Sequence, residues 1–150
     1  MVSVSDIIRA ISNDKSLVLF NTIALAGEDK SIMISRLKLT RKQYYSKISE
    51  LTNAGLIQRN NGKFFLTSLG KVVYEAHILI GQALQLLPKL KAIDSIESSE
   101  FPNSELIKVI DSLITDDTFK QILISKEGYN NIENKKSYNR EHIAQLIRPT

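Results

Sequence analysis

The chain has 150 residues, of which 43% are apolar and 24% charged, and its formal net charge is +4. This length fits one domain, or a small domain with an appendage, and the apolar content argues against disorder throughout. The absence of cysteine excludes disulfides and thiolate metal sites. No apolar run approaches the ~20 residues of a membrane-spanning helix, and the N-terminus lacks the pattern of a secretory signal, so we expect a soluble, cytoplasmic protein without a membrane partner.

Residues 1 to about 28 are predicted to form two helices. The first has a short apolar stripe made by Ile7, Ile8 and Ile11. The second should start after residues 12–14 and stop near Gly27. Its expected inward residues are Leu17, Val18, Phe20, Ile23, Ala24 and Leu25. A further short helix is expected over residues 31–37, with Ile32 and Leu37 inward.

The strongest local signals lie in residues 40–67. Thr40 followed by Gln43 is a capping box, which predicts a helix beginning at Arg41. On that helix one buried stripe is expected, consisting of Tyr44, Ile48 and Leu51. Gly55 can supply the left-handed residue that ends it. Asn60-Asn61-Gly62 then predicts a tight hairpin over residues 56–67, because a type I′ turn needs positive φ at both central residues.

A long apolar segment covers residues 71–93, and Pro88 should kink this helix or begin a new one. It carries a heptad seam of Val73, Ala76, Ile80, Ala83, Leu87 and Leu90. A second apolar row adjoins that seam and contains Val72, Leu79, Leu86 and Ile93. So wide a stripe favours a homodimer, with Val73, Ala76, Ile80, Ala83 and Leu87 as dimerisation residues. The alternative is that the C-terminal helices, at 104–124 and 139–147, fold back over it.

Three segments follow this long helix. A helix capped by Asn103 or Ser104 should run to about Ile114, with its inward residues at Leu106, Ile110 and Leu113. Asp116-Asp117 should start another helix that carries Phe119, Ile122 and Leu123. Residues 126–139 are polar and are expected to form a loop before a last helix at 139–147. The expected domains are 1–70, a linking and dimerisation helix over 71–98, and an appendage over 99–150.

The positive charge is concentrated in one window. Residues 30–71 hold nine Lys and Arg but a single acid, Glu50, which leaves this window at +8 and the rest of the chain at −4. A local positive field beside a mildly acidic remainder is typical of a surface that binds a polyanion. The alternative is a basic face that only keeps the protein in solution.

The order of helix, short helix, capped helix and hairpin resembles a winged helix-turn-helix, and the residues resemble ArsR/MarR-like transcriptional regulators of archaea and bacteria over about residues 14–75. The likeness is carried by ISRLKLTRKQYYSKISELTNAGLI, in which Leu51, Ala54, Gly55, Leu56 and Ile57 close the capped helix, and by FFLTSLGKVV, residues 64–73. The resemblance implies a mainly α fold with a small β-hairpin wing, followed by a long helix of the dimerisation type and C-terminal helices. It implies a regulator of transcription that binds double-stranded DNA through its capped recognition helix.

The candidate DNA-binding residues lie on that helix and on the hairpin: Arg41, Lys42, Gln43, Tyr45, Ser46, Lys47, Arg59 and Lys63. Lys42, Gln43 and Ser46 are expected to face outward, Tyr45 and Lys47 to flank that face, and Arg41 to lie at the start of the helix. Lys47 is either a phosphate contact or only a solvated charge. Gln43 carries the amide that pairs with adenine, and Lys42 or Arg41 can address guanine or phosphate. Arg59 and Lys63 flank a short turn, so phosphate contact is expected from them rather than base reading. Tyr45 is expected either to be buried against the hairpin or to lie on the sugar-phosphate backbone of the DNA.

Two other functions are compatible with the same pattern. A winged helix can also serve as a protein–protein interaction module of a transcription-related assembly, and RNA binding is a more distant alternative. The sequence has no nucleophile elbow, Gly-rich phosphate loop or zinc-ligand spacing that would support an enzyme, a cofactor or a metal site, and His77 and His142 lie 65 residues apart.

Overall fold

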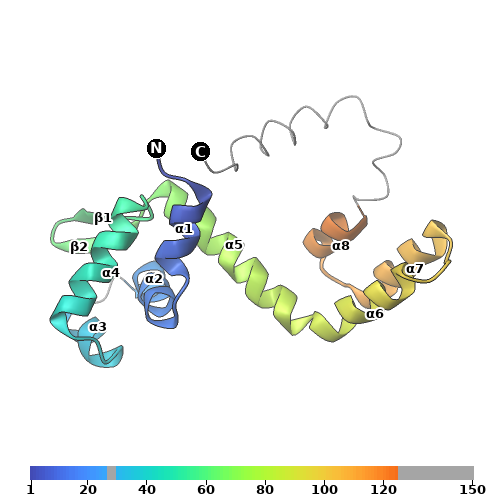
Figure 1. The fold of residues 1–150 in the computed structure, drawn as a ribbon, viewed down its shortest axis with the longest axis horizontal. Coiled ribbons are helices and arrows are strands. Elements are labelled where there is room, and N and C mark those ends of the chain that lie inside the picture. Colours follow the sequence, from blue (N-terminus) through green and yellow to red (C-terminus); the bar gives the residue numbers. More distant parts are fainter. Residues whose placement is uncertain (27–29, 125–150) are drawn as a thin grey trace. The chain divides into compact units, whose positions relative to one another are not determined.

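The computed structural model describes residues 1–26 and 30–124, and this part of the chain is mainly helical with one two-stranded antiparallel hairpin (Figure 1). The helices are α1 (Val4–Ile11), α2 (Asp14–Ala26), α3 (Lys30–Arg36), α4 (Arg41–Asn53), α5 (Ser68–Gln85), α6 (Leu87–Glu97), α7 (Asn103–Leu113) and α8 (Asp117–Ile124). The strands are β1 (Ile57–Asn60) and β2 (Lys63–Leu66). No helix in this described part is long and apolar enough to cross a membrane.

The chain divides into two compact units, Met1–Ile80 and Gly81–Thr150, and the division falls inside α5. Each unit is treated by itself below. The expected helix stop at Gly27, the loop at 126–139, the last helix at 139–147 and His142 lie outside the described residues.

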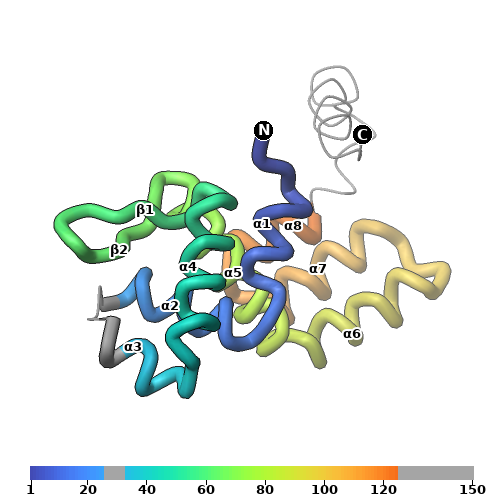
Figure 2. Tube along the Cα trace, turned by 60° about the vertical axis from the view of Figure 1, so that its left-hand side comes forward, coloured from blue at the N-terminus to red at the C-terminus, as the bar shows by residue number. Residues whose placement is uncertain are grey.

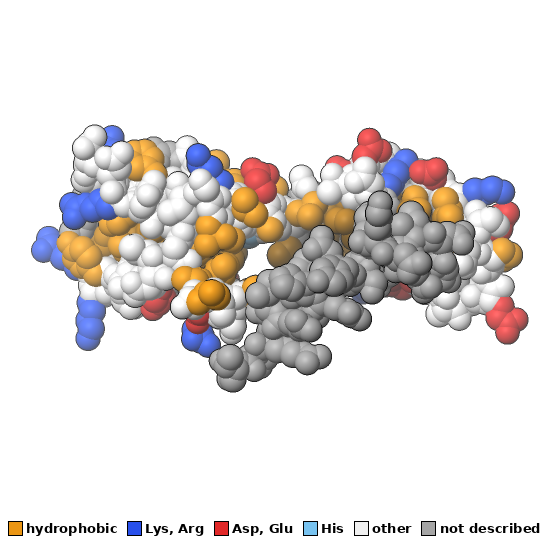
Figure 3. Space-filling view, turned by 90° about the horizontal axis from the view of Figure 1, so that it is seen from above, with side chains coloured by type: hydrophobic (Ala, Val, Ile, Leu, Met, Phe, Trp, Pro, Cys, Tyr) orange, Lys and Arg blue, Asp and Glu red, His pale blue; other side chains and the backbone are white. Residues whose placement is uncertain are grey.

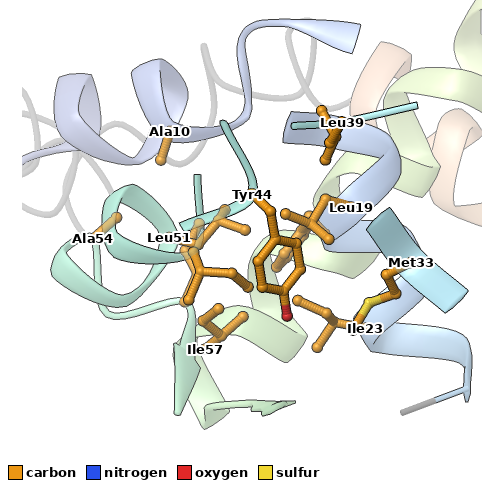
Figure 4. Close-up of a cluster of buried hydrophobic side chains, with 12 residues drawn as sticks. Ala10, Leu19, Ile23, Met33, Leu39, Tyr44, Leu51, Ala54 and Ile57 are labelled. Carbon is orange, nitrogen blue, oxygen red and sulfur yellow. The ribbon is translucent and has the colours of Figure 1, made fainter. Parts of the chain in front are cut away.

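The first unit is built around one apolar cluster to which α1, α2, α3, α4 and the hairpin contribute (Figure 4). Tyr44, Ile48 and Leu51 of α4 are all buried in it, which confirms the stripe expected from their spacing. Figures 1 and 2 both show α4 beside α1 and α2. The side of α4 opposite this stripe therefore faces away from the core.

The inward face of α2 differs from the expected one. Leu19 is fully buried, whereas Val18 and Leu25 are 45% and 76% exposed, so their placement inward was wrong. The run from Leu17 to Phe20 is apolar on every side of the helix, and its spacing alone does not select one face. On α1, Ile8 is likewise exposed, while its neighbours in the expected stripe pack against the core.

The hairpin forms as its turn residues predict. Asn60 pairs with Lys63, and the two residues between them have φ angles of 48° at Asn61 and 81° at Gly62. Two successive positive φ angles are the signature of a two-residue type I′ turn. The expectation of a tight ribbon is confirmed.

Thr67 and Gly70 hold the start of α5 against Gly55 and Leu56, the two residues just before β1. The Thr67 hydroxyl donates to the Gly55 carbonyl at 2.6 Å and accepts from the Gly70 N–H at 2.9 Å, so it caps α5. Gly70 is buried, and a Cβ added there would overlap the Leu56 carbonyl oxygen. The Leu-Thr-x-x-Gly pattern of residues 66–70 thus has a steric and a hydrogen-bonding reason.

In the second unit α7 packs against α6 and α8, and its buried apolar residues are Ile93, Leu106, Ile110, Ile114 and Phe119. Pro88 lies in the first turn of α6, so the expected break is confirmed as a new helix. The expected cap of α7 by Asn103 or Ser104 was wrong, because Pro102 occupies the cap position without a side-chain hydrogen bond. Asp116 does cap α8, since its carboxylate accepts from the N–H groups of Thr118 and Phe119.

Candidate nucleic-acid interface

Helix α4 begins with a complete capping box. The Thr40 hydroxyl accepts from the Gln43 N–H at 3.1 Å, and the Gln43 side-chain oxygen accepts from the Thr40 N–H at 3.0 Å. The remaining N–H groups of the first turn give this end of the helix a partial positive charge. Arg41 and Lys42 stand in that same turn, and both are exposed. The first turn of α4 is therefore the most positive part of the helix.

We define the α4 outer face as the exposed side chains that turn away from the buried stripe, namely Lys42, Gln43, Ser46, Ser49, Glu50 and Asn53. Arg41 is exposed at the start of the helix, beside this face. Beyond the first turn the face consists of small polar groups and one carboxylate. Ser46 donates to the only acid of the helix, Glu50, at 3.3 Å. The face changes along its length from basic at the N-terminus to neutral and weakly acidic in the second half.

Gln43 is tied to the helix start. Its amide oxygen already accepts from Thr40, and a bidentate contact to adenine needs that oxygen together with the amide nitrogen. Gln43 therefore offers a nitrogen donor while the cap stays intact. Lys42 and Ser46 are also exposed on this face, and the Ser46 hydroxyl donates to Glu50.

Lys47 does not lie on the outer face. Its ammonium group donates to the Asn13 side-chain oxygen at 3.2 Å and to the Ser16 hydroxyl at 3.0 Å. Ser16 is fully buried, and the Asn13 oxygen also accepts from the Ser16 N–H at 2.9 Å. Lys47 is thus half-buried against the start of α2, and we correct its placement among the exposed cations that point outward.

Tyr45 is 54% exposed and meets the buried Tyr44 edge to face, with ring centroids 5.6 Å apart. It is therefore not buried against the hairpin.

The hairpin adds two exposed cations near its turn. Lys63 is the first residue of β2, and Arg59 lies one residue before the end of β1, opposite Phe64. Figure 3 shows Lys and Arg side chains projecting from the end of the first unit. Arg41, Lys42, Arg59 and Lys63 are the four expected cations that the structure leaves exposed.

The five dimerisation residues fall into two groups. Val73 packs against the core of the first unit, so its place on an outward seam was wrong. Ala76 and Ile80 are exposed, and so is Leu87, whereas Ala83 is half-buried. Within the first unit the exposed apolar residues of α5 are Leu69, Val72, Ala76 and Ile80, which we call the α5 outer row. Leu69 was missed, although its spacing of three from Val72 continues the row.

The described residues contain no group of three or more His, Cys, Asp or Glu side chains able to hold a metal ion. His77 lies on α5 beside Tyr74, with ring centroids 6.1 Å apart. On α1, hydrogen bonds from the Ser3 hydroxyl and N–H hold the pKa of the Asp6 carboxyl below 3.8.

In comparisons with known proteins, no family model, no curated protein and no solved structure matches this chain.

Proposed function

We propose that this protein is a winged helix-turn-helix regulator of transcription that binds double-stranded DNA as a homodimer. In this proposal α3 and α4 form the helix-turn-helix, α4 is the recognition helix, and the β1–β2 hairpin is the wing. The N-terminal turns of α4 enter the major groove, and the wing meets the flanking phosphates.

One observation carries the proposal. The capped first turn of α4 carries the exposed cations Arg41 and Lys42, while Tyr44, Ile48 and Leu51 anchor the same helix in the core. A helix held on one side and basic at its exposed N-terminus is suited to a groove lined by phosphates. The exposed wing cations Arg59 and Lys63 extend the positive charge beyond the helix.

The homodimer is supported by the α5 outer row. Val72 and Ile80 are 68% and 64% exposed, which is a large apolar exposure for two side chains on one helix. A partner helix from a second copy would remove this row from water. A two-fold dimer would also present two recognition helices to one duplex, where successive major grooves are about 34 Å apart.

The test is a mobility-shift titration of the full chain on random-sequence and selected duplexes at several salt concentrations. We expect Lys42→Ala and Arg59→Ala to weaken binding to every duplex, because each removes a contact with phosphate. Ser46→Ala should alter preference at particular base pairs. Lys89→Ala, which removes an exposed lysine from the second unit, is the matched control and should leave affinity unchanged.

Two results would contradict DNA binding. One is an absence of affinity for duplex DNA at low salt, and the other is an equal loss of affinity in the Lys89→Ala control. Tighter binding to structured RNA than to duplex DNA at the same salt would favour the RNA-binding alternative.

Dimerisation is tested separately by sedimentation equilibrium. Ile80→Glu places a charge in the α5 outer row and should shift the protein toward the monomer. Gln82→Glu adds the same charge at an exposed polar position of the same helix and should not. A wild-type protein that is monomeric at micromolar concentration would overturn the homodimer.

A further inference from the structure

The first unit has a cleft on the side of the hairpin away from the turn. It has a volume of about 590 Å³ and lies between α2, both strands of the hairpin and the first turns of α5. Pockets of about 300–1,000 Å³ are the usual size for small-molecule sites. The lining residues used below are Ile23, Leu66, Phe65, Tyr74, Lys71 and Glu75.

The walls of the cleft are apolar and aromatic. Phe65 projects from β2 and is 44% exposed, and Tyr74 of α5 packs edge to face on the buried Phe20. Ile23 and Leu66 add aliphatic surface to the lining. Phe65 is thus a large aromatic side chain that is nearly half exposed to water beside other apolar groups. A ligand that packs on it gains binding free energy by burying apolar surface.

Two opposite charges stand together on one wall. Lys71 and Glu75 are four residues apart on α5, so their side chains project from the same face, with Cβ atoms about 5–6 Å apart. Neither has a salt-bridge partner among the residues that the structure describes. The order Lys before Glu is also the less favourable one for a pair within a helix.

This charge pattern selects the kind of ligand. A simple anion is attracted by Lys71 and repelled by Glu75. A simple cation is attracted by Glu75 and repelled by Lys71. A molecule that carries a carboxylate and an ammonium group on one carbon atom can pair with both side chains at once. The third substituent on that carbon atom of the ligand then lies against Phe65 and Tyr74.

We propose that this cleft binds a free α-amino acid with an apolar or aromatic side chain. Lys71 pairs with the ligand carboxylate, Glu75 pairs with the ligand ammonium, and the aromatic wall takes the side chain. The proposal concerns a ligand site on the first unit and does not depend on DNA binding.

The experiment is an NMR titration of the full chain with three probes: L-phenylalanine, 3-phenylpropionate, which lacks the ammonium, and phenethylamine, which lacks the carboxylate. We expect saturable shifts at Gln58, Phe65 and residues 71–75. Both analogues should bind more weakly than L-phenylalanine, by about two- to fivefold, because each loses one partly exposed ion pair.

Two variants test which side chain of the protein pairs with which charged group of the ligand. Lys71→Met should lose the preference for L-phenylalanine over phenethylamine but keep its preference over 3-phenylpropionate. Glu75→Gln should show the opposite pattern. Such a cycle between ligand and protein isolates each pair from general effects on the fold. Lys89→Met is the control and should keep both preferences.

The proposal is overturned if the wild-type protein binds the three probes equally, if the shifts do not saturate, or if they map to residues away from the cleft. Since the titration contains no DNA, its outcome is separate from that of the mobility-shift assay.

Discussion

Gly70 shows how one residue can determine the geometry of the first unit. It lies against the backbone of Leu56, so α5 can approach the hairpin only because this position has no side chain. Gly81, on the same helix, has no atom within 4 Å of an added Cβ. The two glycines therefore make a matched pair in which only the space around the residue differs.

We expect Gly70→Ala to lower the free energy of unfolding by at least about 2 kcal/mol, because the added methyl group meets backbone that cannot move aside. Gly81→Ala should raise it by about 0.5–1 kcal/mol, since alanine is the better helix former and nothing crowds it. Urea unfolding of both variants measures the difference. A Gly70→Ala protein as stable as wild type would show that α5 is not held at this contact.

Lys47 and Lys42 are five positions apart on α4. We expect Lys47 to contribute to stability and Lys42 to DNA affinity. Lys47→Met removes the donor to Ser16 and Asn13, and we expect it to cost about 1 kcal/mol of stability because the Ser16 hydroxyl is buried. Lys42→Met should change stability by less than about 0.5 kcal/mol. Thermal unfolding and DNA titration of both variants test this, and a greater loss of DNA affinity in Lys47→Met would reverse the assignment.

At the scale of elements, sequence-based prediction was most accurate where a local signal determined the structure. The Thr40–Gln43 capping box located the start of α4, and Asn61-Gly62 located the hairpin turn, because each depends on residues adjacent in the chain. The inward face of α2 and the partners of Lys47 depend on helices that meet only in the folded unit. Lys47 contacts residues 31 and 34 positions away, and no local pattern carries that information.

The stability of the first turn of α1 should depend on pH. The Asp6 carboxylate accepts two hydrogen bonds from Ser3, and these lower its pKa below 3.8. A lowered pKa means that this stabilisation is present above pH 3.8 and is lost as the pH falls through the folded-state value. We expect a carboxyl ¹³C titration to give a midpoint below 3.8, and Ser3→Ala to bring it back toward 3.8. A wild-type midpoint at or above 3.8 would contradict the capping role.

For the whole molecule, the net charge of +4 conceals a division, because residues 30–71 alone carry +8. The salt dependence of DNA binding should follow the number of cations that reach phosphate rather than the net charge. The slope of log K against log salt is negative. We expect its magnitude to decrease by about 1 per bound copy in Lys42→Ala, and by the same amount in Lys63→Ala. Lys47→Met should leave the slope unchanged, and an equal reduction in that variant would place its ammonium on the DNA.

If the protein is the dimeric regulator proposed above, the exposed α5 outer row also bears on how its cellular amount would translate into promoter occupancy. If joining of two copies must precede tight binding, occupancy rises with roughly the square of concentration when most copies are single, and linearly once they are paired. A modest change in expression would then switch a promoter more sharply than a hyperbolic binder could. The strength with which Val72 and Ile80 attract their counterparts would set the abundance at which that steep response ends.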